Sequence, residues 1–64
     1  MKCTSKGNGI LQLENGEVIL FLKWINSIKG KEYFLANDQE DRQRIYHVSA
    51  RNENKKITEI EAVK

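Results

Sequence analysis

The longest apolar stretch of the chain is EVILFLKWI, from Glu17 to Ile25, in which five bulky apolar side chains follow one another. Successive side chains of a β-strand point to opposite faces of its sheet, so a strand here carries apolar residues on both faces. One face would carry Val18, Leu20, Leu22 and Trp24, and the other Ile19, Phe21 and Ile25. Both faces of this strand are therefore expected to be shielded from water.

Shorter segments on either side of this stretch also have the alternation and composition of strands. They are ILQLE, EYFLAN and RIYHVSA, and polar segments rich in turn formers separate them. Asn15 and Gly16 lie between ILQLE and the long apolar stretch, and Asn-Gly in this position predicts a hairpin with a type I′ turn, in which both residues have positive φ. Gly30 can adopt the left-handed conformation at the next turn without steric cost.

The two ends of the chain are less regular. Residues 1–9, MKCTSKGNG, are small and polar without periodicity, and predict a flexible arm ahead of a single domain over residues 10–64. Near the other end, apolar residues at every third position and a capping box formed by Thr58 and Glu61 would fit a short helix. A short strand from Lys56 to Ile60 is the preferred interpretation. Together the elements predict an all-β protein, an antiparallel meander of four to five strands in a curved sheet or small barrel.

The length of the chain limits what can cover the long apolar strand. Sixty-four residues allow one domain, which buries only about 60% of the surface of its unfolded chain. The tail supplies only Ile57, Ile60 and Val63 toward a second layer. Two arrangements would solve this shortage: a twofold homodimer that pairs the same surface with itself, or a barrel that keeps an apolar patch outside for a partner.

Composition narrows the class of protein only slightly. Eleven Lys and Arg against nine Asp and Glu give a formal net charge of +2, too small to indicate a polyanionic partner. Cys3 is the single cysteine, which excludes an intramolecular disulfide and suits a reducing compartment, although intermolecular oxidation stays open. No apolar stretch approaches the roughly 18 residues of a membrane span, and the first nine residues lack the apolar core of a secretory signal. We therefore expect a soluble cytoplasmic protein.

Residues that could carry chemistry do not form a recognisable constellation. One cysteine and His47, far apart in the sequence, are not a metal-binding cluster, and His47 has no nucleophile arranged beside it. The acidic loop with Asp38, Glu40 and Asp41 lacks the glycine and the terminal glutamate of a calcium loop. The GNG segment is not followed by the Lys-Ser or Lys-Thr of a phosphate loop. The sequence therefore predicts no enzyme, no metal and no cofactor.

Aromatic residues give the sequence its one ambiguous feature. Trp24, Tyr33, Phe34 and Tyr46 fall on adjacent expected strands, and lysines and arginines flank them. Bases could stack on such a sheet, so a small nucleic-acid-binding protein is an alternative. Against this alternative, acidic residues interleave with the basic ones, and in so short a chain most aromatic residues are expected in the core.

The favoured interpretation is a noncatalytic protein-binding module, homodimeric and without membrane attachment, whose partner contacts Trp24, Tyr46, Phe34 and Arg44. Large amphipathic rings dominate interface energetics, which is the reason for placing Trp24 and Tyr46 at the centre of this site. A third alternative is an oligomeric sponge for a nucleotide signal, with pockets at subunit junctions.

The segments LENGEVILFLKWI, IKGKEYFLAND, RIYHVS and KITEIE together resemble the small uncharacterised β-sheet proteins of Firmicutes bacteria and their phages. The resemblance covers residues 10–61 and lies in turn and strand chemistry, so it brings no catalytic residues with it. It implies a compact β domain, often from a mobile element. Small phage proteins of this kind commonly bind and block a host protein, which implies an inhibitor as the specific form of the binding module.

Overall fold

The computed structural model describes residues 1–63, including all side chains in that range except those at positions 26 and 28. Lys64, which the expected domain included, lies outside the described residues. Within this range the chain is all β and has no helix, which confirms the predicted fold class. There are six strands rather than four or five: β1 (Cys3–Gly7), β2 (Ile10–Leu13), β3 (Val18–Ile28), β4 (Lys31–Asn37), β5 (Gln43–Arg51) and β6 (Ile57–Ala62).

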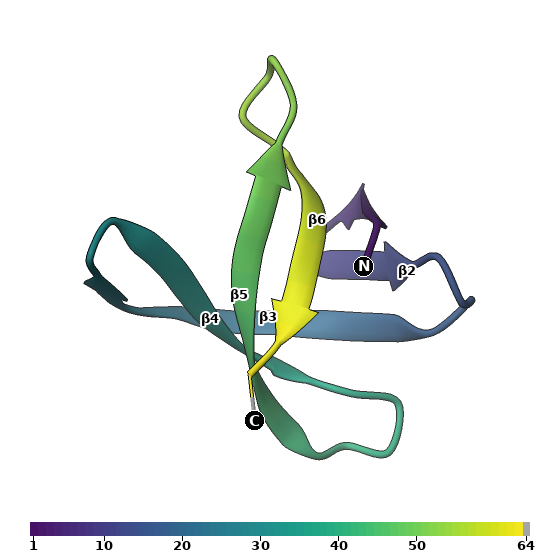
Figure 1. Ribbon diagram of the computed structural model, residues 1–64. Helices are drawn as coiled ribbons and strands as arrows, with labels where there is room; N and C mark the ends of the chain where they lie inside the picture. Colours follow the sequence, from purple (N-terminus) through teal and green to yellow (C-terminus); the bar gives the residue numbers. More distant parts are fainter. Residues whose placement is uncertain (64) are drawn as a thin grey trace.

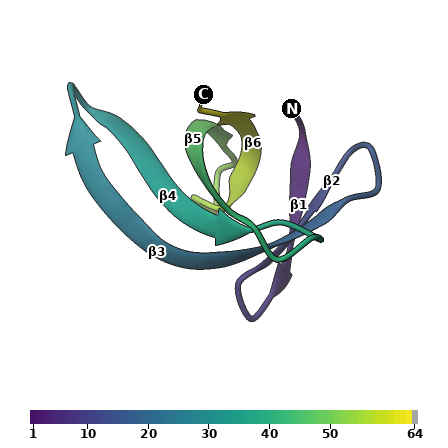
Figure 2. The same cartoon turned by 90° about the horizontal axis from the view of Figure 1, so that it is seen from below.

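The strands form one antiparallel meander that curls into a nearly closed barrel. Each strand pairs with its neighbours in the sequence, in the order β1 to β6. The first and last strands then meet through an isolated bridge between Lys2 and Glu59 and a hydrogen bond from the Ile60 N–H to the Met1 carbonyl at 2.8 Å. Figure 1 shows the long β3–β4 hairpin and the β5–β6 hairpin extending in different directions, and Figure 2 shows β3 and β4 curving with β5 and β6 on their concave side.

The expectation of a flexible arm over residues 1–9 is wrong, because Cys3–Gly7 forms β1. Two physical features hold this segment in place. Cys3 is buried in the barrel core, and Asn8 and Gly9, with φ of 54° and 80°, form a two-residue turn between Gly7 and Ile10. Positive φ at both residues is the type I′ requirement that Asn-Gly satisfies well, so the turn expected at Asn15 and Gly16 occurs at the earlier Asn-Gly.

The hairpin at Asn15 and Gly16 exists but has a different turn. The Leu13 N–H donates to the Glu17 carbonyl at 2.7 Å and the Gly16 N–H donates to the Leu13 carbonyl at 3.0 Å. These bonds enclose a three-residue loop in which Gly16 alone has positive φ, at 92°. This is the hairpin in which a type I turn is followed by one left-handed residue, so the type I′ assignment at this position is corrected.

The same three-residue loop closes two further hairpins without the help of glycine. Asp38 and Asn52 begin these loops, and the left-handed position is taken by Asp41 in one and Lys55 in the other, each with φ of 63°. The side-chain Oδ1 of Asp38 and of Asn52 accepts two backbone N–H bonds in its own loop, at 2.9–3.0 Å. These side-chain bonds fix the loop geometry that glycine fixes elsewhere.

Inward-facing side chains from all six strands fill the barrel. Phe34, Ile19 and Ile60 are the largest fully buried ones, with exposures of 0–1%. The core comprises Cys3, Leu11, Leu13, Ile19, Phe34, Ala36, Tyr46 and Ile60, with Phe21, Val48 and Ile57 packed against it. The ring of Phe34 lies 5.3 Å from that of Phe21 and 5.6 Å from that of Tyr46, so aromatic contacts link three adjacent strands across the interior.

An irregularity in β3 changes the face on which Trp24 lies. Phe21 pairs with Ala36, and Trp24 pairs with Phe34. From the first pair to the second, the chain advances three positions on β3 but only two on β4, so β3 has one extra residue, Leu22. Such a bulge resets the alternation of side chains. Trp24 therefore shares the inner face with Phe34 instead of the outer face with Val18 and Leu20, which corrects the simple alternation expected from the sequence.

The C-terminal segment is the preferred strand, and the helical alternative is wrong. Ile57 and Ile60 both contact the core although they are three residues apart. The pairing of β5 with β6 shifts register on both sides of Ala50, which leaves an extra residue between Ile57 and Glu59. The three-residue spacing that resembled a helix is thus produced by a bulged strand.

Lys55 offers a test of the three-residue loops. A non-glycine residue in the left-handed region is strained, whereas glycine is not. We predict that Lys55→Gly raises the free energy of unfolding by about 0.5–1 kcal/mol, measured by urea denaturation. Lys56→Gly is the matched control: Lys56 does not have positive φ, so glycine there should destabilise. Equal losses from both substitutions would contradict this account of the loop.

Candidate functional site

The outward face of the barrel carries a group of apolar side chains with no cover. Val18, Leu20 and Leu22 on β3 are 37–40% exposed, and Ile45 on β5 and Val63 after β6 are 40% and 43% exposed. Half-buried Ile10 pairs with Leu20, and half-buried Leu35 pairs with Ile45. We call these seven residues, Ile10, Val18, Leu20, Leu22, Leu35, Ile45 and Val63, the outer apolar face.

Charge is sparse on the strands that carry this face. On the outward side, β4 carries Lys31 at its start, followed by Tyr33, Leu35 and Asn37, and β5 carries Gln43, Ile45 and His47. Of these seven residues, Lys31 is the one that is a Lys, Arg, Asp or Glu. On β3 the charged residue is Lys23, which pairs with Leu35. Apolar side chains with few charges among them are typical of the buried centre of a protein interface.

The inner face is open beside Trp24. A crevice of about 230 Å³ is lined by Ser5, Gly9, Leu11, Phe21, Trp24 and Ile57; we call it the Trp24 crevice. Trp24 is 47% exposed. The centre of its ring lies 5.1 Å from that of Phe21 and 5.9 Å from that of Phe34, in edge-to-face contacts.

Arg51 covers part of Trp24 and is held there by other contacts. Its guanidinium carbon lies 5.4 Å from the centre of the indole ring, within cation–π range. Two nitrogens of the same guanidinium donate to the two carboxylate oxygens of Glu32, at 2.8 and 3.1 Å, and a third group of the side chain donates to the Lys55 carbonyl. The bidentate pair orients Arg51 and holds its guanidinium over the Trp24 ring.

Of the four residues expected to contact a partner, the structure leaves only Trp24 and Arg44 accessible. Phe34 is 0% exposed and Tyr46 is 4% exposed, because both lie on the inner face of central strands. Burial also raises the pKa of the Tyr46 hydroxyl. The expectation that these two rings form a partner-binding surface is therefore corrected: they are core residues.

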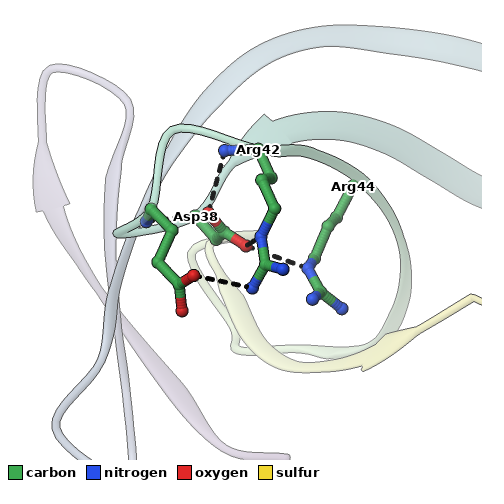
Figure 3. A network of polar contacts seen from close by, with 4 residues as sticks. Asp38, Arg42 and Arg44 are labelled. Atoms are coloured by element: carbon green, nitrogen blue, oxygen red, sulfur yellow. Dashed lines mark hydrogen bonds and ion pairs between the residues drawn. The ribbon is translucent and has the colours of Figure 1, made fainter.

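Arg44 belongs to a polar network at the other mouth of the barrel, which Figure 3 shows centred on Asp38. The Asp38 Oδ2 accepts a hydrogen bond from the Arg44 Nε at 2.9 Å and lies 3.4 Å from the Arg42 Nε. Arg42 also pairs with Glu40 at 3.2 Å. A hollow of about 490 Å³ above Leu13 and Tyr46 is lined by this network. Carboxylates neutralise both arginines, so the hollow offers no net positive charge to an anion.

The Asp38 carboxyl group stays ionised to a lower pH than usual, because several donors bind its carboxylate. The Arg42 backbone N–H, followed by the Arg44 side chain and the Glu40 N–H, lowers the pKa of the Asp38 carboxyl. Only 9% of this side chain is exposed. The carboxylate therefore acts as a structural acceptor for the 38–42 loop, and its negative charge anchors two arginines that sequence inspection alone left free.

These ion pairs and burials bear on the nucleic-acid alternative. Arg42, Arg44 and Arg51 each pair with a carboxylate, and two of the four aromatic rings are buried. Tyr33 faces outward against His47, with ring centres 5.4 Å apart. Of the four rings considered for base stacking, Trp24 is thus the one that is about half exposed. Within residues 1–63 these rings do not form a continuous stacking platform across the strands.

Other residues with chemical potential are isolated. Cys3 is buried, its Sγ lies 3.8 Å from the Ile57 carbonyl, and burial raises the pKa of its thiol. Among residues 1–63, no three His, Cys, Asp or Glu side chains come together in a way that could hold a metal ion. The same part of the chain contains no helix long and apolar enough to cross a membrane.

Sequence reasoning missed the contribution of the first nine residues to the Trp24 crevice. Ser5 and Gly9 line it, and both fall in the segment expected to be a flexible arm. The signal that could have found them is the Asn8-Gly9 dipeptide, which predicts a hairpin turn between Gly7 and Ile10 just as Asn15-Gly16 predicts one at its own position.

Comparisons of the chain with protein-family models, with curated proteins and with solved structures find no match. The resemblance to Firmicutes and phage proteins therefore stays a prediction, and the site has to be interpreted from its own geometry.

The lowered pKa of Asp38 leads to a prediction of how the stability of the protein depends on pH. Its folded-state pKa lies below the ordinary value of 3.8, so its stabilising contribution is fully present above pH 3.8 and is lost as the pH falls through the lower folded value. We predict that Asp38→Asn lowers the free energy of unfolding at pH 7 and that the difference from wild type shrinks below pH 3.8. Denaturant unfolding at pH 7 and pH 2.5 measures this. A difference that does not depend on pH would contradict it.

Proposed function

We propose that the protein is a noncatalytic binding module that docks on another protein through the outer apolar face. The observation that supports this most directly is the exposure of Val18, Leu20 and Leu22 along one side of a central strand. A soluble protein rarely leaves a group of large apolar side chains in water unless a partner covers it. The inner face of the same strand is already filled by the barrel core.

The chemistry of the outer apolar face favours a protein partner over a nucleic acid. On the outward side of β3 and β4 the charged residues are Lys23 and Lys31, whereas a nucleic-acid surface needs many unpaired cations. The three arginines that could supply positive charge from neighbouring strands and loops are paired with Asp38, Glu40 and Glu32. Binding through this face would release water from apolar surface and would change little with ionic strength.

In its specific form the proposal is a homodimeric, cytoplasmic inhibitor that blocks a host protein. The homodimer follows from the same exposed face, because a twofold arrangement can cover an apolar surface with its own copy. The inhibitor role and the mobile-element origin rest on the resemblance of residues 10–61 to small Firmicutes and phage β-proteins.

Leu20 is the residue on which to test this proposal. It is 40% exposed and pairs on either side with Ile10 and Asn37, near the middle of the outer apolar face. We predict that Leu20→Lys weakens partner binding by about 2 kcal/mol or more, as expected for a central interface position, because it buries a charge against an apolar surface. The stability of the isolated barrel should change by less than about 1 kcal/mol, because the side chain is on the surface.

The measurements are the mass of the protein in solution by light scattering and capture of partner proteins from a host lysate. Thr4→Lys on β1 is the matched control, because Thr4 is exposed but lies outside the outer apolar face. A wild-type protein that is monomeric and captures the same proteins as Leu20→Lys would refute the proposal.

A further inference from the structure

The barrel does not close along its whole seam. Pairing between β1 and β6 consists of the Lys2–Glu59 bridge and the adjoining bond between Ile60 and Met1. If the ladder continued, Ser5 would lie opposite Lys56. The Lys56 N–H instead donates to the Asn52 Oδ1 and the Lys56 carbonyl accepts from the Asn52 N–H, both at 2.9 Å. The three-residue loop between β5 and β6 thus takes the groups that would have paired with Ser5.

Ser5 consequently presents a free backbone edge. The Glu14 N–H donates to the Lys2 carbonyl, so the backbone groups of Lys2 point toward β2. In an antiparallel pair every second residue points this way, and the next one is Thr4, which pairs with Gln12. Backbone groups alternate in direction along a strand, so the N–H and C=O of Ser5 point away from β2 into the seam. An open strand edge of this kind is a template for another extended chain.

The Trp24 crevice lies directly beside this edge. Ser5 and Ile57 line it, together with the apolar side chains of Leu11, Phe21 and Trp24. Its volume of about 230 Å³ suits one apolar side chain rather than a larger ligand. An extended chain that bonded to Ser5 would point alternate side chains inward, so one of them would enter the crevice.

Charged residues around the seam are mostly basic. Lys6 follows Ser5 and Lys56 precedes Ile57, both are exposed, and neither takes part in an ion pair among residues 1–63. Of the nearby carboxylates, Glu32 is already paired with Arg51, and Glu59 lies farther along the seam, opposite Lys2. The seam therefore complements a segment that carries acidic side chains next to its apolar one.

We propose that this seam binds an extended segment of another polypeptide, which adds to β1 at Ser5 as a further strand and places one apolar side chain in the Trp24 crevice. This is the peptide-binding mode in which backbone hydrogen bonds provide affinity and a side-chain pocket provides specificity. The site is separate from the outer apolar face and does not depend on the docking proposed there. The acidic flanks of the segment lie toward Lys6 and Lys56.

Trp24 is the single tryptophan of the chain, so its fluorescence reports directly on the crevice. The probe is the peptide acetyl-Thr-Glu-Leu-Glu-Thr-amide, and the control peptide has glycine in place of leucine. We expect the probe to shift the Trp24 emission saturably, with at least tenfold higher affinity than the control peptide. Hydrogen exchange followed by NMR should slow at least tenfold at the Ser5 amide when the peptide is saturating.

Substitutions on β1 separate the crevice from general effects on the strand. Ser5→Leu fills the crevice from within and should weaken peptide binding at least tenfold. Thr4→Leu, one residue earlier and on the opposite face, should change affinity by less than twofold. If Ser5→Leu fails to fold by circular dichroism, the protection of the Ser5 amide in the wild-type protein decides the question.

Several results would overturn this inference. One is an unchanged Trp24 emission at millimolar peptide, and another is a Ser5 amide that stays unprotected while the emission changes. A stronger response to a ten-residue thymidine oligonucleotide than to the peptide would assign the crevice to nucleic acid. Protection of Ser5 that rises with protein concentration alone would assign the edge to a second copy. Leu20→Lys should leave peptide binding unaltered, so failure here is distinguishable from failure of the outer apolar face.

Discussion

The contact of four aromatic rings inside the barrel is the interaction on which the rest of the structure depends. Phe34 on β4 is completely buried, and its ring lies 5.3–5.9 Å from the rings of Phe21, Trp24 and Tyr46. These contacts join β3, β4 and β5, the middle of the meander. In a chain of 64 residues a cluster of this size accounts for much of the apolar surface that can be removed from water.

The cluster also explains why the two accessible surfaces differ. Phe34 needs cover from β3 beyond Phe21, and the bulge at Leu22 supplies it by turning Trp24 inward. The interior is then filled, and no further layer of chain is left for the outward side of β3. Leu20 and Leu22 stay exposed, while Trp24, at the mouth of the filled interior, covers Phe34 with one edge and borders a crevice with the rest of its ring.

Hydrogen bonding in the loops decides where the barrel opens. Asn52 and Asp38 form equivalent loops, each holding two backbone N–H groups with one side-chain oxygen. At Asn52 the loop uses the backbone groups of Lys56, and the seam with β1 opens next to it. At Asp38 the carboxylate binds Arg42 and Arg44 as well, which removes two cations from the surface. The same local motif therefore exposes a strand edge at one end and neutralises charge at the other.

The strands from Ile10 onward could be predicted from the sequence, because alternation, β-branched and aromatic residues and turn formers are local signals. That Phe34 and Ala36 share one face of β4, and Tyr46 and Val48 one face of β5, follows the same alternation. The candidate site could be predicted only in part. Trp24 was identified, but its face was not, since a bulge is set by what the neighbouring strand has to bury.

Local sequence thus determined an all-β meander with an excess of apolar side chains on its longest strand. Asn8-Gly9 allows a hairpin at the start of the chain, but tertiary structure decided that Cys3–Gly7 is a strand, because Cys3 is buried in a core that includes Ile60 on β6. It also decided which Asn-Gly forms the two-residue turn, and that Phe34 and Tyr46 are core and not surface. Each of these outcomes depends on the pairing register of the strands and on which side chains compete for one small interior. Neither of these two factors can be predicted from a short stretch of residues.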